Sequence, residues 1–342
     1  MRPDATAGTN RRLLLAGLAG LALPRRPRSA EAALEPVLER ARSLERLRTL
    51  IIAGNGRILV EHAFRGPPPD RPVNVKSVAK SVISALVGIA IERGLLQGVE
   101  QPIAPILRDR LPKNPDPRLA RITVGHLLSM RAGLERTSGA NYGRWVSSRD
   151  WVRFALSRPF VDEPGGRMLY STGSSHLLSA ILTKASGKST LQLAREWLGQ
   201  PLGIAISSWT RDPQGIYFGG NEMALSPRAL LRFGEMYRQD GRIDGGQVVP
   251  EAWIGASWQA RTSSPFTGHS YGYGWFVAQA GSHPVYYAWG YGGQMLYVLP
   301  DLALTVVITS DADHPSGRDG YVRVLHGLLA EEIVPAVERA SP

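Results

Sequence analysis

The sequence predicts an α+β fold in which helices flank an antiparallel sheet built from both ends of the chain. Residues 50–64 form two strands joined at Gly54-Asn55-Gly56, a combination typical of tight hairpins. Short apolar segments separated by Gly or Pro-Asp turns fill the last quarter, whereas the middle of the chain shows helical spacing. The predicted organisation is therefore a sheet region, residues 33–72 and 255–342, around a mostly helical region, residues 73–254.

The individual elements follow from periodicity and from residues that stop helices. An amphipathic helix over residues 33–48 precedes the hairpin, and the Pro-rich stretch 66–72 then interrupts regular structure. Helices are expected in the inserted region at residues 81–94, 123–130, 148–156, 174–186, 190–198 and 226–239. Strands are expected at residues 274–278, 285–289, 295–299 and 304–309. A closing helix over residues 319–334 is expected to end at Pro335, because proline lacks the backbone N–H that would continue it.

Residues 1–32 resemble an export signal. Arg11-Arg12 precede the apolar stretch 13–23, and Ala30-Glu31-Ala32 offers a cleavage site with small residues. The apolar stretch is too short to span a bilayer, so no stable membrane span is expected. The paired arginines favour a twin-arginine signal, with an ordinary secretory signal as the alternative and an uncleaved amphipathic anchor as a weaker one. We therefore expect an exported, periplasmic protein.

Composition narrows the possible functions. The chain has 342 residues, 43% of them hydrophobic and 20% charged, as in an ordinary globular protein. Its formal charge of +11 falls to about +7 without the six arginines and two carboxylates of residues 1–32. No basic run alternates with aromatic residues, so nucleic-acid binding is not expected. The chain contains no cysteine, which excludes thiol nucleophiles, disulfides and thiolate metal sites.

Ser77-Val78-Ala79-Lys80 is the strongest chemical signal. Residues three apart share a helix face, so Lys80 could remove the proton that keeps Ser77 a poor nucleophile, provided that the amine is uncharged. The plainer alternative is a helix-capping serine and a surface lysine. The segment 82–91 is apolar nearly all round and ends at Gly94, which predicts a buried helix with Ser77 and Lys80 at its mouth. Burial and the positive end of the helix dipole would both lower the pKa of Lys80.

Further segments extend this signal along the chain. They are residues 122–134, 164–172, 224–234, 271–275 and 289–294. Together with the Ser-x-x-Lys pattern, their order and approximate spacing resemble the serine β-lactamase and penicillin-binding superfamily. The resemblance is greatest to its esterase and amide-hydrolase branch, which includes 6-aminohexanoate-dimer hydrolases, and it covers nearly the whole chain after residue 32.

The resemblance implies a role for each matching residue. Ser77 would be the acylated nucleophile, Lys80 its proton acceptor, and Tyr170 the group that shuttles a proton to the leaving group; a core tyrosine is the plainer alternative for Tyr170. The backbone N–H groups of Ser77 and of a residue after Gly290, best matched by Gln294, would form an oxyanion hole.

Four further positions are expected to bind substrate, and two of them depart from the family pattern. Gly292 and Gly293 would let substrate approach the backbone closely, although a turn or bulge also explains them. Thr172 stands where the family usually has asparagine, so its substrate contact is in doubt. Tyr291 replaces a lysine or histidine, which removes the cation expected to hold a β-lactam carboxylate and favours less charged esters or amides. A nearby arginine such as Arg136 could compensate.

Two other patterns are weaker. Gly268-His269-Ser270-Tyr271-Gly272 matches the Gly-x-Ser-x-Gly elbow of α/β-hydrolases, but that elbow needs a strand before the serine and a helix after it. Four dispersed histidines form no His-x-x-x-His pair, so structural hydrogen bonding is favoured over metal binding: His126, His176, His269 and His283. No metal or cofactor is expected.

The sequence therefore predicts a cofactor-free serine hydrolase acting on a small-molecule ester or amide, like a 6-aminohexanoate-dimer hydrolase or a carboxylesterase. A β-lactamase or D-amino-acid peptidase is the alternative within this class. A binding or sensing protein that has lost turnover is the alternative of another class. The sequence leaves the oligomeric state open.

Overall fold

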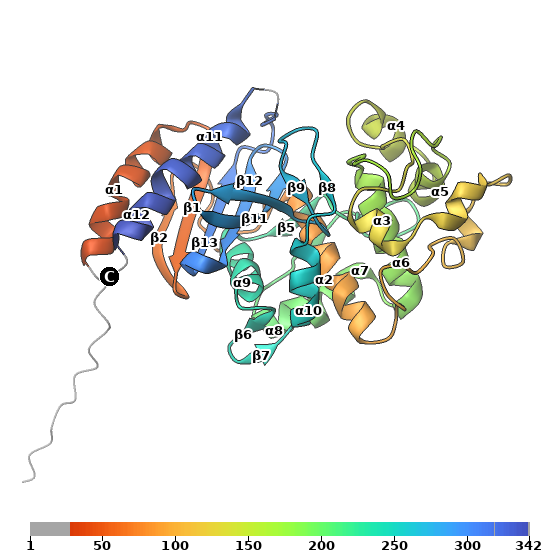
Figure 1. Ribbon diagram of the computed structural model, residues 1–342, viewed down its shortest axis with the longest axis horizontal. Coiled ribbons are helices and arrows are strands. Elements are labelled where there is room, and N and C mark those ends of the chain that lie inside the picture. The colour runs from red at the N-terminus through yellow and green to blue at the C-terminus, as the bar shows by residue number, and fades with distance from the viewer. Residues whose placement is uncertain (1–27, 318, 341–342) are drawn as a thin grey trace, which may run out of the picture.

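The computed structural model describes residues 28–317 and 319–340, and its centre is an antiparallel sheet of eight strands (Figure 1). The strand order is β2-β1-β13-β12-β11-β10-β9-β8. Its strands are β1 Leu47–Gly54, β2 Arg57–Ala63, β8 Thr262–Ser263, β9 Ser270–Tyr271, β10 Phe276–Ala280, β11 His283–Gly290, β12 Gln294–Leu299 and β13 Leu304–Ser310. The N-terminal hairpin pairs with the last strand through β1 and β13, so the two chain ends share one sheet. The predicted α+β fold class is confirmed.

The hairpin forms where the sequence predicted it. Asn55 and Gly56 connect β1 to β2 with φ angles of 52° and 74°. Positive φ at both central residues is what a tight hairpin turn demands, and Asn-Gly supplies it at low cost. The longer predicted strands of the C-terminal quarter also form, each within a few residues of its expected bounds.

Both faces of the sheet are covered, so its central strands are buried throughout (Figure 1). One face packs against α1 Arg28–Ser43, α11 Tyr321–Gly327 and α12 Val334–Ala340 through alternate side chains of the strands: Leu50, Ile52, Tyr297, Val306 and Ile308. The opposite face meets the helical region through the intervening ones: Ile51, Ala53, Leu296, Val298 and Val307. Successive side chains of a strand point to opposite faces of the sheet, so each strand contributes alternate residues to two separate hydrophobic cores.

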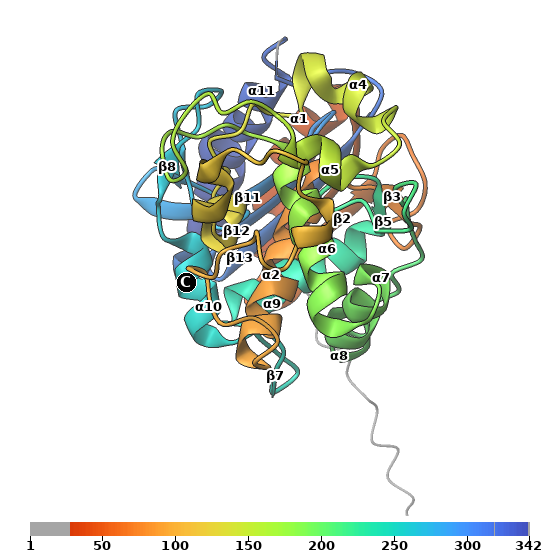
Figure 2. The ribbon, with the colours of Figure 1, turned by 90° about the vertical axis from the view of Figure 1, so that its right-hand side faces the viewer.

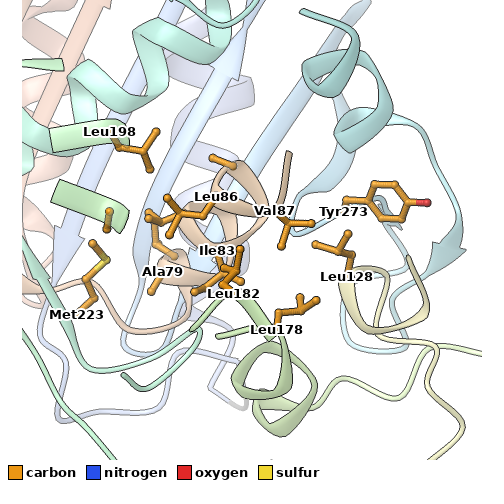
Figure 3. Close-up of a cluster of buried hydrophobic side chains, with 14 of the residues drawn as sticks. Ala79, Ile83, Leu86, Val87, Leu128, Leu178, Leu182, Leu198, Met223 and Tyr273 are labelled. Carbon is orange, nitrogen blue, oxygen red and sulfur yellow. The ribbon is translucent and has the colours of Figure 1, made fainter. Parts of the chain in front are cut away.

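The helical region lies against the second face, with α4, α5 and α6 toward the viewer in Figure 2. Its longer helices are α2 Ala79–Glu92, α6 Thr172–Ser186 and α9 Pro227–Arg238, and its shorter ones are α3 Val124–Leu128, α4 Tyr142–Val146, α5 Trp151–Leu156, α7 Thr190–Ala194, α8 Gln200–Leu202 and α10 Glu251–Trp258. Helix α2 runs through the middle of this core, where Ile83, Leu86 and Val87 meet side chains of other helices (Figure 3). A helix that is apolar all round is stable only in such an interior.

Some elements were not predicted. The strands β3 Val73–Asn74, β4 Ser208–Trp209 and β5 Met223–Leu225 form a small second sheet, and β6 Arg242–Ile243 pairs with β7 Gly246–Gln247. Helices α4 and α10 were also missed. Strands of two or three residues are too short to show an alternating pattern.

The predicted end of the closing helix at Pro335 is wrong. The chain runs from α11 through a π-helical segment, Leu328–Ile333, into α12, which contains Pro335. The π-helical turn is wider than an α-helical one and bonds five residues back, so the helix accommodates a proline ring directly after it. Pro201 likewise follows the π-helical segment Arg195–Gly199.

Most of the predicted export signal, residues 1–32, lies outside the described residues, and α1 already begins at Arg28. Within the described part of the chain, no helix has the length and apolar character needed to cross a bilayer.

Candidate active site

Ser77 lies on a strained turn directly before α2. It is the middle residue of the 3₁₀ turn Lys76–Val78, and Lys76 has a left-handed φ of 51°, an unfavourable conformation for a residue with a long side chain. Asn74 Oδ1 accepts a hydrogen bond from the Lys76 backbone N–H at 2.9 Å, and the Lys76 ammonium pairs with Glu222 at 3.1 Å. The Ser77 side chain stays half-buried and accessible. The turn thus presents this hydroxyl in a fixed orientation.

Lys80 lies one turn further on, in the first turn of α2, and is only 3% exposed. Its Nζ atom lies 2.9 Å from Ser77 Oγ, 3.3 Å from Thr172 Oγ1 and 2.7 Å from the carbonyl oxygen of Gly220. Burial lowers the pKa of Lys80 to about 7. A large fraction of this lysine is therefore uncharged near neutral pH.

These three contacts orient the uncharged amine. A neutral amine has two N–H donors and one lone pair, and the carbonyl of Gly220 can only accept a hydrogen bond. If the amine donates to Gly220 and to Thr172 Oγ1, its lone pair faces Ser77 Oγ. The arrangement therefore suits transfer of the Ser77 proton to Lys80.

Thr172 is buried at the start of α6 and belongs to the surroundings of Lys80. Its hydroxyl also lies 3.0 Å from Ser138 Oγ, which accepts a hydrogen bond from the Thr172 backbone N–H at 2.9 Å. The shorter side chain at this position, which left its substrate contact in doubt, therefore turns toward the lysine.

Tyr170 lies on the other side of Lys80. The Lys80 Nζ atom is 5.1 Å from the centre of the tyrosine ring. Removal from water raises the pKa of Tyr170 to about 12, and a hydrogen bond with Ser77 opposes this shift in part. Tyr170 is thus protonated at neutral pH, and its hydroxyl can donate a proton beside Ser77.

A buried hydrogen-bond network holds the backbone next to the Gly220 carbonyl. His176 and Asp212 are fully buried with 2.9 Å between Nε2 and Oδ2, and His176 Nδ1 accepts the Gly219 N–H at 3.4 Å. Because Nδ1 is an acceptor here, Nε2 carries the proton and donates it to Asp212. A Cβ atom at Gly220 would lie 2.5 Å from Lys80 Cγ, so only glycine lets this backbone reach the lysine.

The turn between β11 and β12 lies beside the Ser77 turn. A Cβ atom on Gly290 would be 2.4 Å from the carbonyl oxygen of Val75. Gln294 begins β12 and is buried; its side-chain amide donates to the carbonyl of Ser310 at 2.8 Å and accepts that residue's N–H at 3.1 Å. Any contribution of Gln294 to an oxyanion hole must therefore come from its backbone N–H.

The two glycines of this turn are required by its packing. Gly292 and Gly293 have φ angles of 83° and 96°, and Cβ atoms there would lie 2.4 Å from the carbonyl oxygen of Asp311 and 2.7 Å from the ring of Tyr321. These contacts account for both residues without invoking substrate. Tyr291, by contrast, is 50% exposed.

A cavity of about 950 Å³ opens beside this turn. Its lining includes Phe266, His269, Trp289, Tyr291, Val322, Arg323 and His326. A smaller cavity of about 350 Å³ shares Phe266 and adds Tyr170 and Arg136, whose guanidinium lies 5.6 Å from the centre of the Phe266 ring. The arginine considered from the sequence therefore lies at the edge of this space.

The rival serine lacks the geometry of a nucleophile elbow. Ser270 belongs to β9, which leads into strand β10, whereas the elbow requires a helix after the serine. In the described residues, 28–317 and 319–340, no cluster of three His, Asp or Glu side chains could hold a metal ion. The histidines bond to other groups; His269 Nδ1, for example, lies 2.8 Å from the Tyr287 hydroxyl.

The structure thus brings Ser77, Lys80, Tyr170 and Thr172 together, with Gln294 and Tyr291 on the neighbouring turn. Sequence reasoning missed the residues that hold them in place: Asn74, Ser138, Asp212, Gly220 and Glu222. The pair Gly219-Gly220 was a usable signal, because adjacent glycines often mark a close approach of backbone to another group. The others carry no local pattern.

Comparisons with known proteins identify the family and the fold of this chain. The family model described as Beta-lactamase matches residues 45–331. A 6-aminohexanoate-dimer hydrolase of Paenarthrobacter ureafaciens is 24% identical over 243 residues, which are 64% of this chain and 59% of that protein, so this chain spans less than two thirds of that relative.

Two solved structures show the same fold. EstCE1, described as a hydrolase with promiscuous acyltransferase activity, has a TM-score of 0.73 at 20% identity. The aligned region is 90% of this chain and 98% of the EstCE1 chain. A D-stereospecific amidohydrolase from Streptomyces sp. has a TM-score of 0.67 at 17% identity, and the aligned region is 86% of this chain and 98% of that one. At these identities the likeness concerns the fold.

Proposed function

This chain belongs to the Beta-lactamase family of hydrolases, as its sequence resemblance predicted, and we propose that it cleaves an ester or amide through an acyl intermediate on Ser77. The contact of 2.9 Å between Ser77 Oγ and a buried Lys80 whose pKa is lowered to about 7 carries this proposal. A lysine in that state is a competent general base at neutral pH, whereas an ordinary surface lysine is not.

The proposed reaction has two stages. Lys80 takes the Ser77 proton as Oγ forms a bond to the carbonyl carbon, and the backbone N–H groups of Ser77 and Gln294 stabilise the oxyanion. Tyr170 donates its proton to the departing alcohol or amine and is reprotonated by Lys80, so the C–O or C–N bond breaks without a charged leaving group. In the second stage water attacks the acyl carbon and its proton follows the reverse route, which releases the acid and free Ser77.

The substrate class follows from the missing cation. Tyr291 stands where the family usually has lysine or histidine, which supports esters or amides of the kind cleaved by carboxylesterases and 6-aminohexanoate-dimer hydrolases over β-lactams or D-amino-acid peptides. Retention of Ser77, Lys80 and Tyr170 in contact supports turnover over a purely binding role.

Labelling with a serine-directed fluorophosphonate tests the nucleophile. We expect one adduct by intact mass, located at Ser77 by peptide mapping and absent from Ser77→Ala, while Ser270→Ala labels like the wild type. No adduct in protein shown by circular dichroism to be folded would leave the binding protein as the better explanation. An adduct on Ser270 would mean that the wrong serine had been assigned.

A substrate panel then separates the hydrolase classes. We expect turnover of short p-nitrophenyl esters or of a linear amide dimer, and little turnover of a cephalosporin or a D-Ala-D-Ala peptide. Preferential cleavage of the cephalosporin would reverse this ranking and show that another group replaces the missing cation.

We also propose that residues 1–32 direct export to the periplasm through the twin-arginine route. Replacing Arg11-Arg12 with two lysines should retain the protein in the cytoplasm, as measured by cell fractionation. Export that is unaffected by this change would favour an ordinary secretory signal.

A further inference from the structure

The large cavity beside the Ser77 turn has an aromatic rim. Phe266 and Tyr291 are 53% and 50% exposed. Among the large hydrophobic side chains that are exposed in the described part of the chain, these two are the aromatic ones. Both line the same cavity, together with Trp289 and Val322. Large apolar side chains gathered at the mouth of a cavity commonly mark a ligand site.

Three lining residues of this cavity lie close to residues of the candidate active site. Tyr291 follows Gly290, whose backbone packs against the Ser77 turn. Gly139, another lining residue, follows Ser138, which bonds to Thr172. The Phe266 ring centre is 6.4 Å from that of Tyr170. A group attached to a carbonyl at Ser77 could therefore extend directly into this space.

The polar part of the lining carries no negative charge. None of the described lining residues of either cavity is Asp or Glu. Burial lowers the pKa of His326 to about 4, and burial also lowers the pKa of His269, so both are neutral at pH 7. The cations of the lining are Arg323 in the large cavity and Arg136 and Arg167 in the smaller one. The charged groups of the lining therefore repel a cationic substrate group, which opposes the weak attraction of the exposed aromatic rings for a cation.

We propose that this cavity binds a bulky aromatic group of the substrate, held between Phe266 and Tyr291, and selects neutral or anionic groups over cationic ones. The inference rests on the proposed acyl-Ser77 chemistry and adds the class of substrate. The volume of about 950 Å³ accommodates a group as large as naphthyl, whereas an acetyl group would leave the aromatic rim without contact. Preference for large aromatic groups is thus expected to reside in these two side chains.

A series of p-nitrophenyl esters tests the size preference. We expect kcat/KM to be higher for 2-naphthoate than for acetate, and Phe266→Ala and Tyr291→Ala each to lower the naphthoate-to-acetate ratio at least tenfold. Ile58→Ala is the matched control, because Ile58 is an exposed apolar residue on β2, far along the sheet, and its ratio should equal that of the wild type. An unchanged ratio in both aromatic variants would overturn the proposal.

A second series tests charge. Benzoate esters with a 4-methyl, 4-carboxylate or 4-trimethylammonium group differ little in size, and we expect the ammonium ester to have the lowest kcat/KM. In Arg323→Gln and Arg136→Gln the penalty on the ammonium ester should shrink. An ammonium ester that reacts as fast as the methyl ester would contradict the charge selection.

Binding to Ser77→Ala separates failure of this inference from failure of the proposed reaction. Quenching of tryptophan fluorescence by 2-naphthoate, lost in the double variants Ser77→Ala/Phe266→Ala and Ser77→Ala/Tyr291→Ala, would support the cavity site even if the wild type cleaved no ester. Naphthoate binding that is equal in all three proteins, or absent from all of them, would reject the site whatever the fate of the acyl-enzyme.

Discussion

The two sides of Ser77 are built in opposite ways. On the Lys80 side the amine nitrogen has three polar neighbours, Ser77 Oγ, Thr172 Oγ1 and the Gly220 carbonyl, which leave it little freedom. On the cavity side, Phe266 and Tyr291 are about half exposed to solvent. The comparison suggests that proton transfer depends on a rigid, substrate-independent arrangement, whereas substrate preference depends on side chains that can change at little cost to the fold.

The largest effect on kcat/KM is expected from Lys80→Met, which keeps the length and apolar stem of the side chain but removes the amine that acts as the base. We expect kcat/KM to fall by roughly 10³ to 10⁴. Because the loss lies in proton transfer, it should be the same for acetate and naphthoate esters, which distinguishes this side of the site from the cavity. Steady-state kinetics of both esters provide the measurement, and a loss confined to one ester would erase the contrast between the two sides.

The pH dependence of kcat/KM should report the protonation of Lys80 on the rigid side of the site. Lys80 must be uncharged to accept a proton and its pKa is about 7, so activity should decline below pH 7, tenfold per unit at the limit and about 100-fold by pH 5. The pKa of Tyr170 is about 12, so no alkaline decline is expected below pH 10. A profile that stays level from pH 5 to 9 would show that another base acts.

The stability of the fold should depend on pH through the same lysine. Its pKa is about 7 in the folded chain and 10.5 in the unfolded one, so between these values the unfolded chain binds more protons. The free energy of unfolding should therefore rise with pH through this window, and the cost of burying Lys80 is fully present below pH 7. Relative to Lys80→Met, the wild type should gain roughly 3 kcal/mol between pH 6 and 9.5.

Urea denaturation of both proteins at the two pH values measures this gain, and comparison with the variant cancels the other titrating groups. A stability difference between the two proteins that is independent of pH would mean that Lys80 keeps its ordinary pKa. Lys80 would then be charged at neutral pH and could not accept the Ser77 proton.

Sequence reasoning found the parts of the site that are close along the chain. Ser77 and Lys80 are three residues apart, and the C-terminal strands are long enough to show alternation. Gly220 reaches Lys80 across 140 residues, and Asn74 meets Glu222 across 148, so no local pattern identifies the partner in either contact. The cavity was out of reach for the same reason, because its lining comes from β11, α11 and loops that are far apart in the sequence.

His176 offers the finest test of the rigid side, because two substitutions divide its two hydrogen bonds. The amide oxygen of Asn lies near the position of Nδ1 and can still accept the Gly219 N–H, whereas the amide nitrogen of Gln lies near Nε2 and can still donate to Asp212. We expect His176→Gln to release the 219–220 backbone, admit water to Lys80 and raise its pKa toward the ordinary value. The pH below which kcat/KM declines should then rise by roughly half to one unit, and kcat/KM at pH 7 should fall several-fold.

His176→Asn should instead keep this decline near pH 7 and lose stability, because Asp212 is left buried without its partner. Urea denaturation and the pH profile of the two variants therefore separate positioning from folding. If both variants shift this decline equally, or if neither does, His176 serves only the packing of the core, and the rigid side of the site ends at the atoms that touch Lys80.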